Sequence, residues 1–328
     1  MSILVCGGAG FIGSHTVLEL INRGEEVVIV DNLITGHKEA VLSGKLYIGN
    51  LCDSEFMDKV FKENNIEAVI DFAAFSLVSE SVKQPLDYYE NNVYGTLCLL
   101  KKMKEYGINK IVFSSTAAIY GEPESIPIKE DDRTLPTNPY GETKLAVERM
   151  LKWCDKAYGI KYVALRYFNV AGADLSGRIG EDHRPETHLI PLILQVPLGK
   201  RDKVTIFGDD YPTKDGTCIR DYIHVIDLAD AHIRALNKLR KDNTSTIYNL
   251  GNGEGFTVKE VIDVARKVTG HPITSVVAER REGDPAKLVA SSEKIIRELK
   301  WIPKHNTLEE IIETAWNWHK NHPNGFLH

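Results

Sequence analysis

A tyrosine and a lysine stand four positions apart in the segment NPYGETKLAVE, which begins at residue 138. A phenol has a pKa of about 10 and is therefore a poor base at neutral pH, but a neighbouring ammonium group stabilises the phenolate and lowers that value. Residues four apart on a helix share one face. Pro139 suits a first helical turn, and Asn138 or Thr137 could cap it. We therefore predict that Tyr140 and Lys144 point the same way.

The same spacing occurs a second time, at Tyr106 and Lys110 in EYGINKIVF. Gly107 follows the tyrosine, and the lysine begins an apolar run that ends at Thr116. This second pair therefore spans a turn between a helix and a strand, and its two residues need not share a face. We prefer the pair at 140 and 144.

The first strand-like run, Ile3–Cys6, leads into a glycine-rich turn. The turn fits two templates, G-x-G-x-x-G from Gly8 and G-x-x-G-x-x-G from Gly7, and both continue through Gly10 and Gly13. Either template lets a pyrophosphate approach the N-terminus of the following helix, where free N–H groups and the helix dipole favour anions.

An acidic residue, Asp31, closes the next apolar run, Val27–Val30. A carboxylate in this place can accept hydrogen bonds from the ribose hydroxyls of a dinucleotide and would repel a 2′-phosphate. The pattern therefore favours NAD over NADP as the cofactor.

Strand-like and helical segments alternate along the first half of the chain. This alternation is typical of an α/β fold with a doubly wound parallel sheet, a Rossmann domain, in which ligands bind beyond the carboxyl ends of the strands. Further strands are expected at 45–51, 68–74, 110–116 and 161–172, and helices at 54–64, 85–105 and 139–157. The strand ends are Gly7, Asp31, Asn50, Ala73-Ala74, Ser115-Thr116 and Asn169.

We expect a nucleotide-binding domain at residues 1–175 and a smaller α/β domain at 176–328, with 222–250 packing back onto the first. The segment 172–188 is polar and punctuated by glycine, as in a long loop. It contains His183 and His188, which we interpret as polar loop residues and not as metal ligands, because no cysteine or glutamate stands at zinc-ligand spacing. No metal is expected.

Charge and composition exclude several classes of partner. The 328 residues carry a net charge of −6, which argues against nucleic-acid and anionic membrane surfaces. The five cysteines are scattered and odd in number, so a reducing compartment fits best. No segment is long and apolar enough to cross a bilayer. We expect a cytoplasmic protein.

The segments GGAGFIG, SSTAAIYG, NPYGETK, LRYFNVAG and RDYIHVIDLADAH together resemble the extended short-chain dehydrogenase/reductase family, and within it the epimerases that act on UDP-hexoses at carbon 4. The resemblance extends from the first strand to about residue 286. It implies that Thr116, Tyr140 and Lys144 form the catalytic trio, and that bound NAD takes a hydrogen from the sugar and returns it to the opposite face.

The same resemblance implies two sets of binding residues. For NAD they are Gly7, Gly10, Phe11, Ile12, Gly13, Asp31, Asn32, Asn50, Leu51, Ala73, Ala74, Asn92, Tyr140, Lys144 and Tyr167. For the UDP-sugar they are Thr116, Asn169, Leu189, Phe207, Arg220, Arg281, Asp284 and Leu288. The resemblance also implies a homodimer formed through helices at about 85–105 and 139–157.

Two alternatives stay open. Nucleotide-sugar 4,6-dehydratases of the same family carry Asp-Glu directly after the threonine, where this chain has Ala117 and Ala118. A non-catalytic dinucleotide sensor would keep the glycine turn and lose the tyrosine or the lysine.

The chain also departs from its relatives at two places. Ser76 occupies a position where relatives carry lysine, so cofactor retention is expected to be weaker. Leu288 replaces a bulky tyrosine, which suggests room for an N-acetyl group on the sugar.

Overall fold

A computed structural model describes residues 1–281 and 285–327. Its centre is a seven-stranded sheet in the order β11-β6-β5-β4-β1-β2-β3, and every pairing in it is parallel. The strands are β1 Ser2–Cys6, β2 Glu26–Asp31, β3 Lys45–Ile48, β4 Ile66–Asp71, β5 Lys110–Ser114, β6 Lys161–Tyr167 and β11 Thr246–Leu250. This is the doubly wound parallel sheet that the alternating segments predict.

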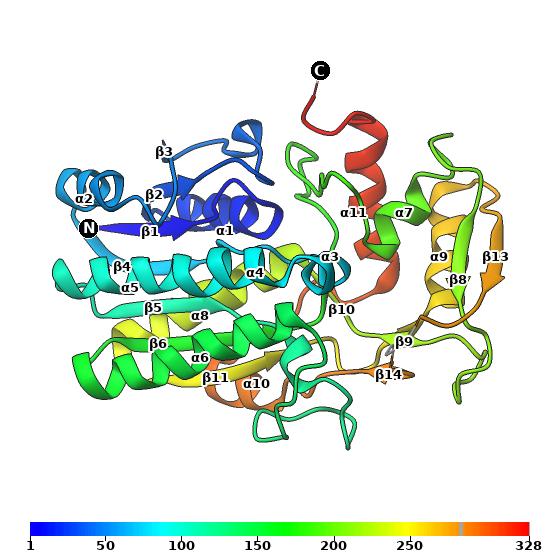
Figure 1. Cartoon of the computed structure of the whole chain (residues 1–328). Helices are drawn as coiled ribbons and strands as arrows, with labels where there is room; N and C mark the ends of the chain where they lie inside the picture. Colours follow the sequence, from blue (N-terminus) through cyan, green and yellow to red (C-terminus); the bar gives the residue numbers. More distant parts are fainter. Residues whose placement is uncertain (282–284, 328) are drawn as a thin grey trace.

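Helices cover both faces of this sheet (Figure 1). On one face, α1 (Phe11–Asn22) and α8 (Val225–Asp242) pack on the side chains of Ile3 and Val5. On the other face, α2 (Ser54–Glu63), α5 (Gly95–Glu105) and α6 (Pro139–Tyr158) pack on Leu4 and Cys6. Successive strand residues thus enter opposite hydrophobic cores, which explains why the strands are continuous apolar runs.

Two predicted segments differ in detail from the structure. The strand expected at 161–172 divides at Phe168, so that β7 (Asn169–Ala171) leaves the large sheet and pairs with β10 (Tyr222–His224). The helix expected at 85–105 consists of α4 (Pro85–Tyr88), a π-helical turn (Tyr89–Tyr94) and α5. It is preceded by α3 (Val78–Lys83), which the sequence analysis does not identify.

Residues after 188 form most of a second cluster of elements with its own core. It contains α7 (Leu189–Leu194), α9 (Val258–Thr269) and α11 (Leu308–Asn321). Short strands lie beside them: β8 (Val204–Phe207) pairs with β13 (Ser275–Ala278), and β9 (Ile219–Arg220) lies between β12 (Phe256–Thr257) and β14 (Lys287–Leu288). In Figure 1 this cluster faces the carboxyl ends of the large sheet.

The chain returns to the large sheet through β10, α8 and β11, and β11 pairs with β6 at its edge. Helix α10 (Glu293–Leu299) packs beside it, and Trp301 is buried in the same core as α8. Two short 3₁₀ turns (Lys38–Ala40 and Ala117–Tyr120) follow β2 and β5. Among the described residues, no helix is long and apolar enough to span a membrane.

Candidate active site

A cavity of about 790 Å³ lies at the carboxyl edge of the large sheet. Most of the residues that the sequence predicts for cofactor and substrate contribute to its wall. These are Gly7, Gly10, Phe11, Ile12, Gly13, Asp31, Asn32, Asn50, Leu51, Ala73, Ala74, Thr116, Tyr140, Lys144, Tyr167, Asn169, Arg220, Arg281 and Leu288. The wall combines apolar surface with a few polar groups, as small-molecule sites do.

Three described residues that the sequence predicts for the site are not part of the cavity wall. Asn92 is buried behind the wall, where its amide accepts from the N–H of Phe75 (2.8 Å) and donates to that residue's carbonyl (3.0 Å). It therefore fixes the loop that carries Ser76, which does line the cavity. Leu189 begins α7 and packs against the second core, and the ring of Phe207 lies under a guanidinium of the wall. Asp284 lies outside the described residues.

The glycine turn between β1 and α1 leaves no space for larger residues. Gly7 has a φ of +73°, which favours glycine, and a Cβ on Gly13 would stand 2.1 Å from the carbonyl oxygen of Gly7. The first turn of α1 contains no acidic residue, and Gly10 caps the helix without a side chain. Backbone N–H groups are thus open to a diphosphate at the helix N-terminus, and the residues present fit the pyrophosphate of a dinucleotide.

The carboxylate of Asp31 is buried at the end of β2 and is held in place by two backbone groups. One oxygen accepts from the N–H of Ala9 (2.9 Å) and the other from that of Leu33 (2.8 Å). Each oxygen can accept a further hydrogen bond, and Asp31 lines the cavity. This arrangement suits the two hydroxyls of an adenosine ribose.

The three residues that the sequence predicts to be catalytic all line this cavity. Asn138 caps α6 by accepting from the N–H of Gly141 (2.9 Å), as the sequence predicts, and the first turn of the helix then presents Tyr140. Thr116 stands at the carboxyl end of β5, and a hydrogen bond joins its hydroxyl to the phenol of Tyr140. One turn further along α6, Lys144 donates from Nζ to the carbonyl oxygen of Ser114 (2.7 Å).

Burial shifts the pKa of each of these groups so as to favour its uncharged form. Burial raises the pKa of Tyr140, and the hydrogen bond from Thr116 opposes that rise. Burial lowers the pKa of Lys144 to about 8, against the attraction of Asp71 and Glu148. Lys144 therefore keeps its positive charge at neutral pH and can stabilise a phenolate on the same helix face.

Asp71 is a functional candidate that the sequence analysis did not identify. It is buried at the end of β4, where it accepts from the N–H of Ala73 (3.1 Å) and the hydroxyl of Thr96 (3.3 Å). Burial raises its pKa to about 6, and the charge of Lys144 opposes that rise. The signal was available in AVIDFAA, where an acid closes an apolar run in the same way as Asp31 closes VVIV.

A buried polar network holds the residues that follow β5. The guanidinium of Arg166 binds both oxygens of Glu148 (3.0 and 2.6 Å) and donates to the hydroxyl of Tyr120 (2.7 Å). Ser115, next to Thr116, donates to the same carboxylate (2.5 Å). Buried networks of this kind are rigid only when every member is satisfied, and here they fix the backbone that carries Thr116.

Two arginines give the far wall its positive charge. Arg220 lies on β9 and donates to the carbonyl oxygen of Pro285 (2.9 Å). The guanidinium of Arg281 lies 4.0 Å from the centre of the Phe207 ring. Both line the cavity, and an arginine fork suits phosphate oxygens.

Fold and site together define a class, the Rossmann-fold enzymes that use a tyrosine–lysine pair beside a dinucleotide. The comparison with known families agrees, since the NAD dependent epimerase/dehydratase family matches residues 3–251. The chain belongs to this family.

Individual relatives are similar over nearly the whole chain. It is 63% identical to a UDP-glucose 4-epimerase of Halalkalibacterium halodurans, over 99% of this chain and 98% of the relative. A crystal structure of a UDP-glucose 4-epimerase superposes with a TM-score of 0.98 at 57% identity and covers both chains completely. The UDP-glucose 4-epimerase of Bifidobacterium longum, solved with NAD+ and UDP, has a TM-score of 0.94 at 42% identity over 99% of this chain and 100% of its own.

Proposed function

We propose that the protein is an NAD-dependent isomerase that interconverts UDP-galactose and UDP-glucose. The observation that carries the proposal is the meeting of Thr116, Tyr140 and Lys144 at one end of a cavity whose other walls suit a dinucleotide and a diphosphate. The similarity to a 4-epimerase solved with NAD+ and UDP supports it. When bound, NAD would provide the group that accepts a hydride from carbon 4 of the sugar and returns it.

The side chains of the trio would manage the proton. Tyr140, as a phenolate, takes the proton from the 4-hydroxyl and later returns it, acting first as base and then as acid. Lys144 holds the charge of that phenolate, and its ammonium would also bind the ribose next to the nicotinamide. Thr116 donates to the reacting oxygen in both its alcohol and its ketone form.

Inversion requires that the 4-keto sugar turn over while the nucleotide stays bound. We assign the diphosphate to Arg220, Arg281 and Asn169, which all line the cavity. Strong contacts to the hexose would stabilise the ground state without helping the reaction, and the residues after Thr116 are Ala117 and Ala118. Neither alanine can move a proton, which disfavours elimination of water and with it the dehydratase alternative.

Conversion of UDP-galactose tests the proposal directly. The purified protein, supplied with NAD and UDP-galactose, should yield UDP-glucose on chromatography with no accumulation of NADH. A 4-keto-6-deoxy product would show a dehydratase instead. Binding of NAD without any sugar conversion would show a non-catalytic sensor. Either result contradicts the proposed activity.

The position of Leu288 extends the proposal to N-acetylated sugars. Leu288 lies on β14 beside Arg220 and lines the cavity, and a leucine leaves more space there than a tyrosine would. UDP-N-acetylglucosamine and its galacto epimer should therefore also be converted. Leu288→Tyr should lose turnover of the acetylated pair by at least tenfold and keep turnover of UDP-glucose. Equal losses on both pairs would contradict this role.

We also propose that the protein is a homodimer in the cytoplasm. The helices expected to form a homodimer expose large apolar side chains, among them Leu86 (79%), Trp153 (67%) and Tyr94 (48%). Burying them against a second copy would remove this surface from water. Sedimentation at micromolar concentration should then show twice the chain mass of 36.8 kDa. The five free cysteines support a reducing, cytoplasmic setting.

A further inference from the structure

The loop expected to be merely polar brings two histidines and two glutamates together. Glu181, His183, Glu186 and His188 each offer one ligand atom, and these atoms all lie within 4.8 Å of one another. Nδ1 of His188 lies 2.7 Å from Oε1 of Glu181 and 3.4 Å from Oε1 of Glu186. Nδ1 of His183 lies 3.2 Å from Oε1 of Glu181 and 3.7 Å from Oε2 of Glu186.

Three of these atoms are buried without a hydrogen bond. Oε1 of Glu181 and Nδ1 of both His183 and His188 have no hydrogen-bond partner among the described residues, despite their closeness to one another. The side chain of Glu181 is only 4% exposed. A buried polar atom without a partner is costly. The close contacts are at ion-pair distances but lack hydrogen-bond geometry.

The carboxylates are held in place by the surrounding structure. Oε1 of Glu186 accepts from the N–H groups of Thr187 (2.7 Å) and His188 (2.8 Å). The carbonyl oxygen of Glu181 accepts from the indole N–H of Trp318 on α11 (3.2 Å). A Cβ on Gly180 would stand 2.2 Å from the Trp318 ring, so the loop approaches α11 as closely as glycine permits. Fixed ligands of this kind reduce the ordering cost of binding an ion.

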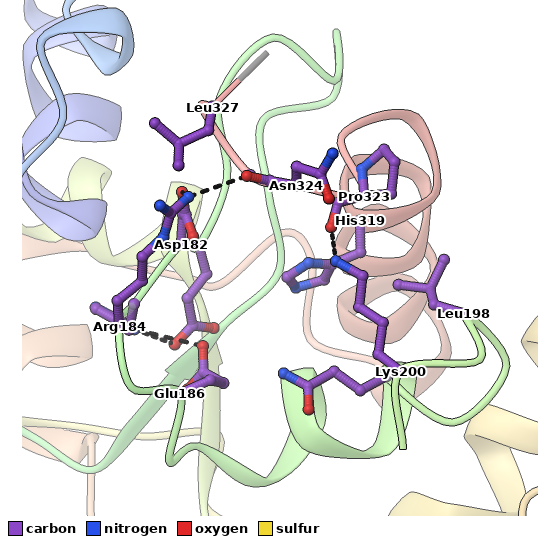
Figure 2. Close-up of a pocket in the computed structure, with 13 residues that line it drawn as sticks. Asp182, Arg184, Glu186, Leu198, Lys200, His319, Pro323, Asn324 and Leu327 are labelled. Atoms are coloured by element: carbon purple, nitrogen blue, oxygen red, sulfur yellow. Dashed lines mark hydrogen bonds and ion pairs between the residues drawn. The ribbon is translucent and has the colours of Figure 1, made fainter. Parts of the chain in front are cut away.

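The cluster is reachable from solvent. Glu181, His183 and Glu186 line a second pocket of about 470 Å³ between the loop and α11, and Figure 2 shows Glu186 and His319 on facing sides of it. Arg184 reaches across to the carbonyl oxygen of Asn324 (3.0 Å). Glu181, His183 and His188 also line the large cavity. The cluster therefore separates the two spaces and has an entry path from each.

We propose that these four side chains bind one divalent transition-metal ion of the zinc class. Two imidazole nitrogens with two carboxylate oxygens are a mixed set that zinc accepts in tetrahedral geometry. Bonds of ~2.05 Å place neighbouring ligands of a tetrahedral site ~3.3 Å apart. The two Nδ1 atoms lie 2.7 and 3.2 Å from Oε1 of Glu181, and they lie 3.4 and 3.7 Å from the two different oxygens of Glu186.

The ion would fasten the loop beside the dinucleotide site without taking part in proton transfer. The ring of His183 meets that of Phe11 edge-on at 6.3 Å, and Phe11 begins the helix whose N-terminus faces the pyrophosphate. A metal bound to the loop would thus join the glycine turn, through His183, to α11, through Glu181.

Zinc titration of the chelator-treated full chain tests the site. Calorimetry should show one zinc ion per chain at micromolar affinity or tighter, and added zinc should raise the unfolding temperature by several degrees, because the ion binds the folded state. Cobalt should give the intense visible absorption of a tetrahedral site. If the chain binds no zinc and its unfolding temperature does not respond, the cluster is an ion-pair group only and the proposal fails.

Matched variants identify the ligands. His188→Gln should lower zinc affinity at least tenfold and abolish the cobalt spectrum, while the same change at exposed His271 should alter neither. Glu181→Gln, which keeps the side-chain shape, provides a second ligand variant if His188→Gln does not fold. Zinc binding that is equal in wild type and in a folded ligand variant would place the ion elsewhere and overturn the assignment. None of these readouts depends on the epimerase activity.

Discussion

At the scale of single residues, burial changes the pKa values of the groups that line or support the candidate site. Tyr140, Lys144 and Asp71 lie at the carboxyl edge of the sheet, where loss of water moves every pKa toward the uncharged form. The charges of Lys144 and Asp71 each oppose that effect in the other group. Burial moves the pKa of Tyr140 away from neutrality, so the proposed role of this phenol as a base depends on a positive charge beside it.

Removing the phenol hydroxyl should abolish proton transfer and leave the fold intact. We expect Tyr140→Phe to bind NAD and to lose roughly 10²–10⁴-fold in kcat for UDP-galactose, the range typical of a lost general acid–base. Tyr106→Phe is the matched control, because its hydroxyl donates to Asp58 (3.0 Å) far from the cavity. It should retain its activity. A Tyr140→Phe variant as active as this control would show that another group takes the proton.

The charge of Asp71 should set the alkaline limit of activity. Asp71 raises the pKa of Lys144, so Asp71→Asn removes that attraction and the pKa should fall below its present value of about 8. The lysine then loses its proton at lower pH, and the alkaline limb of the kcat/KM profile should move down by roughly one unit or less. Measuring the profile from pH 6 to pH 10 checks this. An unmoved alkaline limb would show that Lys144 does not control it.

At the scale of elements, the features that depend only on neighbouring residues could be predicted from the sequence. The glycine turn, the acid that ends β2 and the Asn-Pro start of α6 all depend on neighbours in sequence, and the structure has each of them. Asp71 also has a local signal, because it ends β4 as Asp31 ends β2.

Other features depend on contacts between distant segments. The run 161–172 divides because β7 pairs with β10, which lies about fifty residues later in the chain. No local sequence pattern at Phe168 predicts this division. The pairing of Glu181 and Glu186 with the two histidines depends on how the loop folds against α11. Spacing rules derived from short zinc motifs could not detect it.

The start of α6 allows stability and activity to be separated. Asn138→Ala removes the side-chain acceptor for the N–H of Gly141 and should cost about 1 kcal/mol of unfolding free energy. Since Tyr140 lies two residues away, we also expect a loss in kcat at temperatures where the variant is fully folded. Thr307→Ala removes the corresponding cap of α11, where Thr307 accepts from the N–H of Glu310 (3.2 Å).

Thr307→Ala should cost a similar free energy of unfolding and leave kcat unchanged, because α11 does not present a catalytic residue. Urea unfolding and initial-rate assays on both variants supply the comparison. If the two variants lost the same fraction of kcat, the effect of Asn138 would be one of stability alone.

At the scale of the whole molecule, the two cores on the faces of the sheet enclose groups that acid must eventually charge. His15, His224 and His232 are at most 2% exposed. Burial lowers the pKa of His15 and His232 to about 4 and that of His224 to about 3. Their rings are neutral in the folded chain at pH 5, whereas in the unfolded chain the same rings bind protons below about pH 6.5.

The sign of the effect on stability follows from this difference. Between about pH 6.5 and pH 4 the unfolded state binds more protons, so the free energy of unfolding rises with pH and is lost as pH falls. For one histidine with a folded pKa of about 4, the loss at pH 5 is ~2 kcal/mol relative to neutral pH. Buried Asp71 and Asp221, whose pKa values burial raises to about 6, act in the opposite direction. A difference between variants therefore isolates the histidine better than the whole pH curve.

His232→Phe provides that difference. The ring lies on α8, 4.6 Å from the ring of Phe72, and its Nε2 is buried without a hydrogen-bond partner among residues 1–281 and 285–327. Phenylalanine removes the titrating ring together with the contact of its Nδ1 to the carbonyl oxygen of Leu228 (2.9 Å). The drop in unfolding free energy between pH 7.5 and pH 5 should be ~2 kcal/mol smaller in the variant than in wild type. Urea unfolding at the two pH values measures it, with His271→Phe at an exposed position as control. An equal drop in the variant and in wild type would mean that His232 gains its proton in the folded chain as readily as in the unfolded one, and that the core on this face of the sheet admits water.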